Sequence, residues 1–263
     1  ELDELKAERQ LARYTKVGAF AEGSIKQSPK IEDIDAAANE AATSKMNDLP
    51  QPTDGQKEAG NYKVGRIALQ GMRISIENPA GSVRSGVSKN GNKWSNTMKS
   101  HYGYILGTVG KDKDHIDTFV GRNPASSKVF IVDQTNESGG FDEHKVMLGY
   151  NSAREARAAY LENYSKGWKG LGKLSATDVE GLKKWLSSGD TTKPYSAPKD
   201  PKWSEIQRDD ARSMAIDNVL AKDDRDPPLR PRTQTRLTGI MDRLYKGEID
   251  EREVAREVER LTT

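Results

Sequence analysis

A change of residue pattern after the first sixty positions most constrains the fold of this chain. Residues 62–69 and 72–77 alternate between polar and apolar side chains. Such alternation is typical of strands that bury one face. Similar short segments return at residues 118–120, 128–132 and 145–148. Short strands that are punctuated by Gly and Asn clusters indicate a small barrel or sandwich rather than a parallel sheet.

The sequence around these strands divides the chain into five parts. The parts are a helical N-terminal extension, a linker, the strand-rich domain, a mostly irregular linker with one helix, and a helical hairpin, at residues 1–48, 49–59, 60–194, 195–232 and 233–263. Apolar spacing predicts helices at 31–46, 153–164 and 176–186. Because the chain begins at Glu1 and not at Met, we expect a processed product or a piece of a longer polypeptide.

Composition argues against several classes of protein. The 263 residues carry a net charge of only +2, so a strongly basic nucleic-acid binder is not indicated. The chain has no cysteine, which removes disulfides, thiolate zinc sites and a cysteine nucleophile. Its apolar runs fall far short of the roughly 20 residues that span a bilayer. We therefore expect neither a nucleic acid nor a membrane as partner.

Three aspartates, Asp112, Asp114 and Asp117, lie in a polar loop that runs into an apolar strand. In extended backbone the first two face the same way, and the third can turn inward where the strand begins. Converging carboxylates repel each other unless a cation neutralises them, and Mg²⁺ prefers oxygen ligands. On spacing alone a solvated acidic turn is the simpler interpretation, because Asp is common in turns. The loop lacks the Gly and Glu positions of an EF-hand.

The residues around this loop favour the metal site. Further acids and interleaved basic or phenolic residues occur at Glu77, Asp133, Asp142, Arg84, Lys93, Tyr102, Lys145, Tyr164, Lys166 and Lys169. Acids that hold metal, beside Lys, Arg and Tyr, are the set that a phosphate-rich substrate requires. His101, His115 and His144 lack zinc spacing, so we interpret them as supports of neighbouring carboxylates or as packing residues.

The order of these motifs resembles that of the family I soluble inorganic pyrophosphatases over about half of the chain. The matching segments are Ile-Glu-Asn-Pro, Tyr-Gly-Tyr-Ile, the three-aspartate loop, an Asp-to-Lys hairpin and a Tyr-Ser-Lys segment, at residues 76–79, 102–105, 112–117, 133–145 and 164–169. More specifically, the chain looks like the pyrophosphatase-like domain of phage and mobile-element multi-domain (polyvalent) proteins. The resemblance implies an α+β fold with a small closed OB-like β-barrel and packed helices.

The resemblance also implies a role for each matching residue. The implied metal ligands are Asp112, Asp117, Asp142, Asp133 and Glu77. The implied catalytic and phosphate-binding residues are Asp114, which orients the water nucleophile, Tyr102, Lys145, Arg84, Tyr164 and Lys166. Three departures from the family pattern stand out. Ser85, Gly86 and Val87 replace a second acid and base shortly after Arg84. Lys113 replaces a Gly and is expected to keep the turn from using positive φ, and Asp142 stands one residue too far from Lys145.

The implied function is the Mg²⁺-dependent hydrolysis of a phosphoanhydride, first of all pyrophosphate to two phosphates, with two or more Mg²⁺ ions. A second interpretation is a pyrophosphatase-like binding or structural module of a phage or mobile-element protein, with little or no turnover. A third is hydrolysis of a nucleotide or other diphosphate. The helical ends are expected to dock a protein partner. The expected location is the cytoplasm, or the host cytoplasm or virion for a phage-encoded chain.

Overall fold

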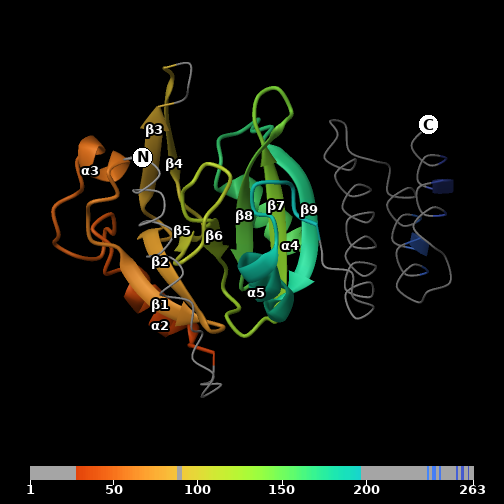
Figure 1. Ribbon diagram of the computed structural model, residues 1–263, viewed down its shortest axis with the longest axis horizontal. Coiled ribbons are helices and arrows are strands. Elements are labelled where there is room, and N and C mark those ends of the chain that lie inside the picture. Colours follow the sequence, from red (N-terminus) through yellow and green to blue (C-terminus); the bar gives the residue numbers. More distant parts are fainter. Residues whose placement is uncertain are drawn as a thin grey trace, which may run out of the picture. The chain divides into compact units, whose positions relative to one another are not determined.

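The computed structural model describes residues 28–87 and 91–196, together with a few residues between 236 and 260 (Figure 1). Residues 1–27 and nearly all of the predicted linker at 195–232 lie outside the described residues. Among the residues that are described, no helix is both long and apolar enough to cross a membrane.

Seven strands form one mixed sheet in the order β1-β2-β5-β6-β8-β7-β9. The strands are β1 (Gly65–Leu69), β2 (Met72–Asn78), β5 (His101–Ile105), β6 (Asp117–Val120), β7 (Lys128–Thr135), β8 (Phe141–Leu148) and β9 (Leu171–Asp178). β6 and β8 pair in parallel, whereas the other neighbours in the sheet are antiparallel. β3 (Val83–Val87) and β4 (Lys93–Thr97) form a separate antiparallel ribbon, which extends above β2 and β5 in Figure 1.

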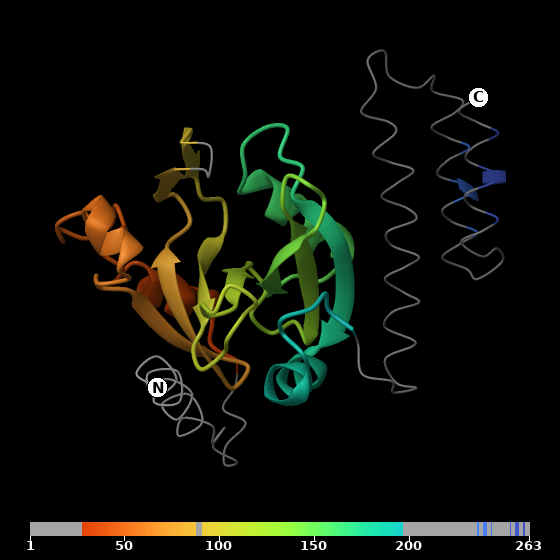
Figure 2. The same ribbon diagram turned by 45° about the horizontal axis from the view of Figure 1, so that its top comes forward.

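The sheet is open, which corrects the expectation of a closed OB-like barrel. Within residues 28–87 and 91–196, β1 and β9 are the edges and no pairing joins them. The helix α2 (Ile31–Ala38) and the turn after it lie against the β1 edge (Figure 2). The Ala42 amide donates to the Lys63 carbonyl at 2.8 Å, and Gly65 approaches the Ala37 backbone closely. The α+β class is confirmed.

One face of the sheet carries the hydrophobic core. Ile74 and Ile76 of β2 point to the same side because side chains alternate along a strand. They pack with residues of β1, β5, β6, β7 and β8, with Ile34 from α2 and with Leu182 from α5 (Val179–Ser188). Burying each such side chain stabilises the fold by about 1.5–3 kcal/mol. Ile34 is fully buried, so α2 packs on the core of this domain.

Two of the predicted helices differ in extent from the observed ones. The helix predicted at 31–46 ends at Ala38, and Asn47 then donates to the Asn39 carbonyl at 2.7 Å, which stabilises a turn. The helix predicted at 176–186 begins only at Val179, because β9 pairs with β7 up to Asp178. The side chain of Asp178 then caps the helix.

The other helices agree better with the sequence pattern. α4 (Ala153–Glu162) matches the helix predicted at 153–164. The short α3 (Asp54–Glu58) lies in the predicted linker, where Thr53 accepts from the Gln56 amide as N-cap.

Only part of the predicted C-terminal hairpin is described. The described residues of this segment are all helical: Arg236, Gly239, Ile240, Arg243, Glu253, Arg256, Glu257 and Arg260. A guanidinium nitrogen of Arg243 donates to both carboxylate oxygens of Glu257, at 3.0 and 3.1 Å. This ion pair joins the two predicted helices of the hairpin, which otherwise stays a prediction.

Gly103 lies where β5 passes very close to β2. A Cβ at this position would lie 1.9 Å from the Ser75 carbonyl oxygen and 2.8 Å from the Ile76 Cα. Both atoms belong to the backbone, so the sheet itself would have to shift. We expect Gly103→Ala to lower the free energy of unfolding by about 2–3 kcal/mol, measured by urea denaturation. Gly140→Ala is the matched control, because the nearest atom there is 3.5 Å away. Equal effects of the two substitutions would contradict this explanation.

Candidate functional site

A polar cluster lies on the second face of the sheet, where β5, β6 and β8 run side by side. The strand register places Tyr102 opposite Phe119, and Asp117 opposite Lys145. Residues that pair directly across neighbouring strands point to the same face. Tyr102, Asp117 and Lys145 therefore project away from the hydrophobic core, into a common site.

Lys145 is the centre of this cluster. Its ammonium group donates to Asp117 Oδ2 and lies 2.8 Å from Glu143 Oε2 and 3.3 Å from the Tyr102 hydroxyl oxygen. The Tyr102 hydroxyl donates to the same Asp117 oxygen at 2.5 Å. Only 2% of the Lys145 side chain is exposed. Burial alone would lower the pKa of Lys145, but its anionic neighbours, Asp117 foremost, raise it well above the ordinary value. The site thus holds a buried, charged ammonium group.

Arg84 brings a second cation to the same tyrosine. A guanidinium nitrogen of Arg84 donates to the Tyr102 hydroxyl at 3.0 Å. The guanidinium carbon lies 4.2 Å from the centre of the Tyr102 ring and 5.2 Å from that of Trp94. Trp94 belongs to β4, which pairs with the strand that carries Arg84. The β3–β4 ribbon therefore places a predicted phosphate-binding residue in the cluster.

Neighbouring acids raise the pKa of two carboxyl groups in the cluster, Glu77 and Glu143. Burial raises the pKa of Glu77 and Asp117 raises it further, whereas Arg84 lowers it. Burial also raises the pKa of Glu143, Lys145 opposes this effect, and both Asp117 and Asp112 add to it. Asp117 therefore acts on both Glu77 and Glu143.

These carboxylates fit Mg²⁺ in the kind of ligand that they offer, since Mg²⁺ prefers hard oxygen donors. In the described part of the chain, however, no three acidic or histidine side chains converge closely enough to hold a metal ion. The ammonium group of Lys145 neutralises part of the negative charge instead.

Glu143 is a site residue that the sequence argument missed. It precedes Lys145 by two positions in β8, so the two side chains point to the same face. No hydrogen bond or ion pair joins Asp142 to the cluster among the residues that the structure describes. With Glu143 as the acid before Lys145, the extra residue in the family spacing disappears. The alternation of side chains along β8 was the signal that could have found it.

Asp133 lies on the opposite face of the sheet. It pairs with His144, whose Nε2 is 3.3 Å from Asp133 Oδ1, and the Tyr195 amide donates to that oxygen at 2.9 Å. The structure therefore does not bring Asp133 into the cluster. The next residue, Gln134, faces the cluster, where its Nε2 donates to Glu143 Oε1 at 2.7 Å.

The last predicted phosphate-binding residues follow α4. The Tyr164 ring stacks on Trp168, with ring centres 4.6 Å apart and planes 5° apart. Burial raises the pKa of Tyr164, and Lys145 opposes this, which places the phenol beside the cluster. Lys166 is exposed, and no hydrogen bond or ion pair joins it to the cluster within the described residues.

The aspartate loop is exposed and is held by short-range hydrogen bonds. The Gly110 amide donates to the Asp114 carbonyl at 2.7 Å, and the Asp114 amide donates to Asp112 Oδ1 at 3.1 Å. Lys113, between the two aspartates, has a φ of 73°. This value corrects the expectation that a lysine would keep the turn out of the left-handed region, because the two hydrogen bonds hold it there.

Left-handed backbone at Lys113 predicts a stabilising substitution. An L-residue in this region costs about 1–2 kcal/mol, and a glycine adopts it freely. We expect Lys113→Gly to raise the free energy of unfolding by up to about 1 kcal/mol, measured by urea denaturation, because the entropy of the unfolded glycine offsets part of the gain. Lys113→Ala is the control: it removes the same side chain but keeps the strain. An equal gain from alanine would contradict the role of φ.

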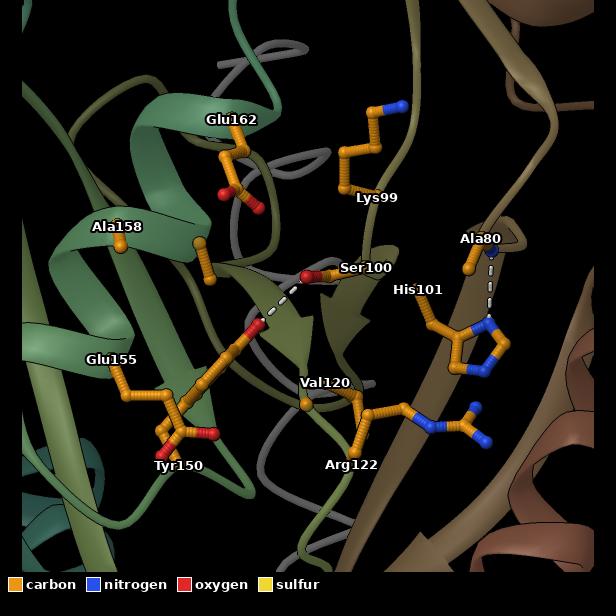
Figure 3. Close-up of a pocket in the computed structure, with 12 residues that line it drawn as sticks. Ala80, Lys99, Ser100, His101, Val120, Arg122, Tyr150, Glu155, Ala158 and Glu162 are labelled. Carbon is orange, nitrogen blue, oxygen red and sulfur yellow. Dashed lines mark hydrogen bonds between the residues drawn. The ribbon is translucent and has the colours of Figure 1, made fainter.

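A separate pocket of about 290 Å³ lies between α4 and the ends of β5 and β6 (Figure 3). His101 lines it and accepts from the Ala80 amide at Nδ1, at 3.1 Å. Its Nε2 therefore carries the proton and donates to Asp35 at 2.8 Å, where Arg122 also donates. Because side chains alternate along β5, His101 points away from Tyr102, so this pocket is distinct from the cluster.

The comparisons agree with the order of motifs. The family model of inorganic pyrophosphatases matches residues 54–187, just over half of the chain. This range contains all nine described strands and every residue of the cluster. None of the curated proteins matches the chain. The chain belongs to the inorganic pyrophosphatase family.

Proposed function

We propose that this domain hydrolyses a phosphoanhydride, with inorganic pyrophosphate as the first substrate to test. The observation that carries the proposal is the buried Lys145 ammonium group between Asp117, Glu143 and Tyr102, with the guanidinium group of Arg84 on the same phenol. Two fixed cations beside one phenol offer converging donors to phosphate oxygens. Membership in the pyrophosphatase family supports the same chemistry.

The cations of the cluster would bind the two phosphate groups of the substrate. Arg84 uses one of its five N–H donors on Tyr102 and has others for a phosphate oxygen. Lys145 holds its position through Asp117 and Glu143, so it needs no reorganisation to meet an anion. Lys166, an exposed residue after α4, would add positive charge.

The carboxylates would bind Mg²⁺ on the other side of the substrate. Asp112, Asp117, Glu77 and Glu143 are the proposed ligands, because Asp117 raises the pKa of both Glu77 and Glu143, and Asp112 adds to that of Glu143. Bound Mg²⁺ supplies a water of lowered pKa and neutralises phosphate charge. Asp114, on the same loop as Asp112, would accept a hydrogen bond from the attacking water and so orient it. Asp133 faces the other side of the sheet, and no bond joins Asp142 to the cluster within the described residues, so neither is a proposed ligand.

A phosphate-release assay tests this function. The wild type with pyrophosphate and Mg²⁺ is expected to release two phosphates per substrate, and Asp114→Asn is expected to lose about 10²-fold or more in kcat. Asp190→Asn, on an exposed loop after α5, is the matched control and should keep the wild-type rate. No release by the wild type, or an unchanged rate in Asp114→Asn, would reject the proposal.

The same assay separates the other interpretations. Faster release from nucleoside diphosphates than from pyrophosphate would identify a nucleotide hydrolase. Binding of pyrophosphate in calorimetry without any release would identify a binding module. A phage or mobile-element context, a protein partner of the helical ends, and a location in the cytoplasm or virion stay predictions from the sequence.

A further inference from the structure

Gln134 forms three short hydrogen bonds in the wall of the site. Only 5% of this residue is exposed. Its Nε2 donates to Glu143 Oε1 at 2.7 Å, and its Oε1 accepts from the hydroxyls of Tyr160 and Tyr164, at 2.7 and 2.8 Å. One amide thus connects β8 with the end of α4.

The chemistry of its neighbours fixes the orientation of this amide. The other oxygen of Glu143 lies 2.8 Å from the Lys145 ammonium group, so Glu143 is held as a carboxylate and can only accept. The Gln134 atom that faces it must be the nitrogen. The amide oxygen then faces both phenols, and both must donate to it. Tyr160 can do so while its own oxygen accepts from Trp168 Nε1 at 3.0 Å.

We propose that Gln134 is a positioning residue that holds Glu143 and Tyr164 in their working positions, an inference that rests on the proposed function. The bond to Glu143 Oε1 leaves Oε2 directed at Lys145. The Tyr164 hydroxyl donates its only proton to Gln134. This phenol can therefore only accept a hydrogen bond in the site, and its ring is held in place. Tyr164 therefore helps phosphate binding by shaping the site rather than by donating a proton to the substrate.

Strand alternation decides which residue at this point of β7 faces the cluster. In this chain the acid, Asp133, faces the other side of the sheet, and the residue that faces the cluster is an amide. The uncharged Gln134 side chain cannot serve as an anionic ligand. Its N–H group, however, donates a hydrogen bond to Glu143, which an ionised acid at this position could not do.

Two substitutions separate the bond to Glu143 from the bonds with the two phenols. Gln134→Leu removes all three hydrogen bonds at similar volume. Gln134→Glu keeps an acceptor for both phenols but loses the donor to Glu143 and sets two carboxylates against each other at pH 8. Thr177→Val is the matched control, because Thr177 is as buried in the neighbouring strand β9 but points to the opposite face.

Two measurements are made on the full chain. The first is kcat and KM for pyrophosphate with Mg²⁺. The second is acrylamide quenching of Trp168 fluorescence without substrate, obtained as the difference from the same protein carrying Trp168→Phe. Trp168 stacks on Tyr164 and donates to Tyr160, so it reports whether both phenols stay in place.

We expect Gln134→Leu to lower kcat about 10²-fold and to raise Trp168 quenching about twofold. Gln134→Glu should lower kcat similarly but keep the wild-type quenching, and Thr177→Val should change neither. Unchanged kcat and quenching in Gln134→Leu, or equal losses in Thr177→Val, would overturn the proposal. If the wild type has no turnover, the proposed function fails, and the quenching of the two Gln134 variants still decides whether this amide holds the phenols.

Discussion

Replacing Lys145 by Met is expected to lower kcat/KM for pyrophosphate about 10³-fold and to destabilise the domain by about 3 kcal/mol. The ammonium group is buried and contacts Asp117 and Glu143, whose side chains are only 19% and 25% exposed. Removing the cation leaves two partly buried carboxylates with the same charge. Removing one member of a buried ion pair is costly because the remaining charge has no compensation. Urea denaturation and the phosphate-release assay measure the two effects.

Two further variants test whether these losses come from the removal of the Lys145 charge. Lys128→Met, on an exposed position of β7, changes the same side chain on the same sheet and should leave stability and kcat/KM near wild type. Glu143→Gln in the Lys145→Met background removes one of the uncompensated charges, so part of the lost stability should return while activity stays low. Wild-type activity in Lys145→Met would exclude this lysine from phosphate binding.

Asp117→Asn is expected to produce the second large loss, about 10³-fold in kcat/KM. One oxygen of Asp117 accepts from both Tyr102 and Lys145. An asparagine of equal size keeps an acceptor for both donors, but it loses the negative charge that compensates the Lys145 ammonium group. The loss of stability should be smaller than for Lys145→Met, about 1–2 kcal/mol, because Lys145 retains Glu143. The same assay and denaturation experiments measure both effects.

Asp142→Asn is the matched control for this prediction. It neutralises a nearby acid that no hydrogen bond joins to the cluster within the described residues, so kcat/KM should stay within about threefold of wild type. A loss in Asp142→Asn as large as that in Asp117→Asn would show that Asp142, rather than Glu143, is the acid that serves the site beside Lys145.

Much of the sheet could be predicted because its strands bury one face. Ile74 and Ile76 alternate with polar residues, and the strand predicted there is observed. The β3–β4 ribbon was not predicted, because its residues alternate only between exposed and half-buried positions and offer little apolar signal. The last residues of β9 are predicted as the start of a helix, but their pairing with β7 makes them strand. Whether a sheet closes depends on such pairings between distant strands, which local patterns do not contain.

The candidate site depends even more on pairings of this kind. Asp117 and Lys145 are 28 positions apart, and only the parallel pairing of β6 and β8 sets them opposite each other. The sequence pointed to both residues through their motifs but not to their contact. Along β7 and β8 a shift by one residue moves a side chain to the other face. For this reason Gln134 faces the cluster and Asp133 does not. For the same reason Glu143, rather than Asp142, lies on the same face of β8 as Lys145.

The central claim is that the acids around Lys145 hold divalent cations against a phosphoanhydride. Anomalous diffraction from crystals with Mn²⁺ and a non-hydrolysable pyrophosphate analogue tests it most directly. We predict manganese peaks bound by Asp117 and Glu143 oxygens, with the analogue in contact with Lys145 and Arg84. An ordered analogue away from Lys145, or manganese bound only on the Asp133 face of the sheet, would contradict the claim.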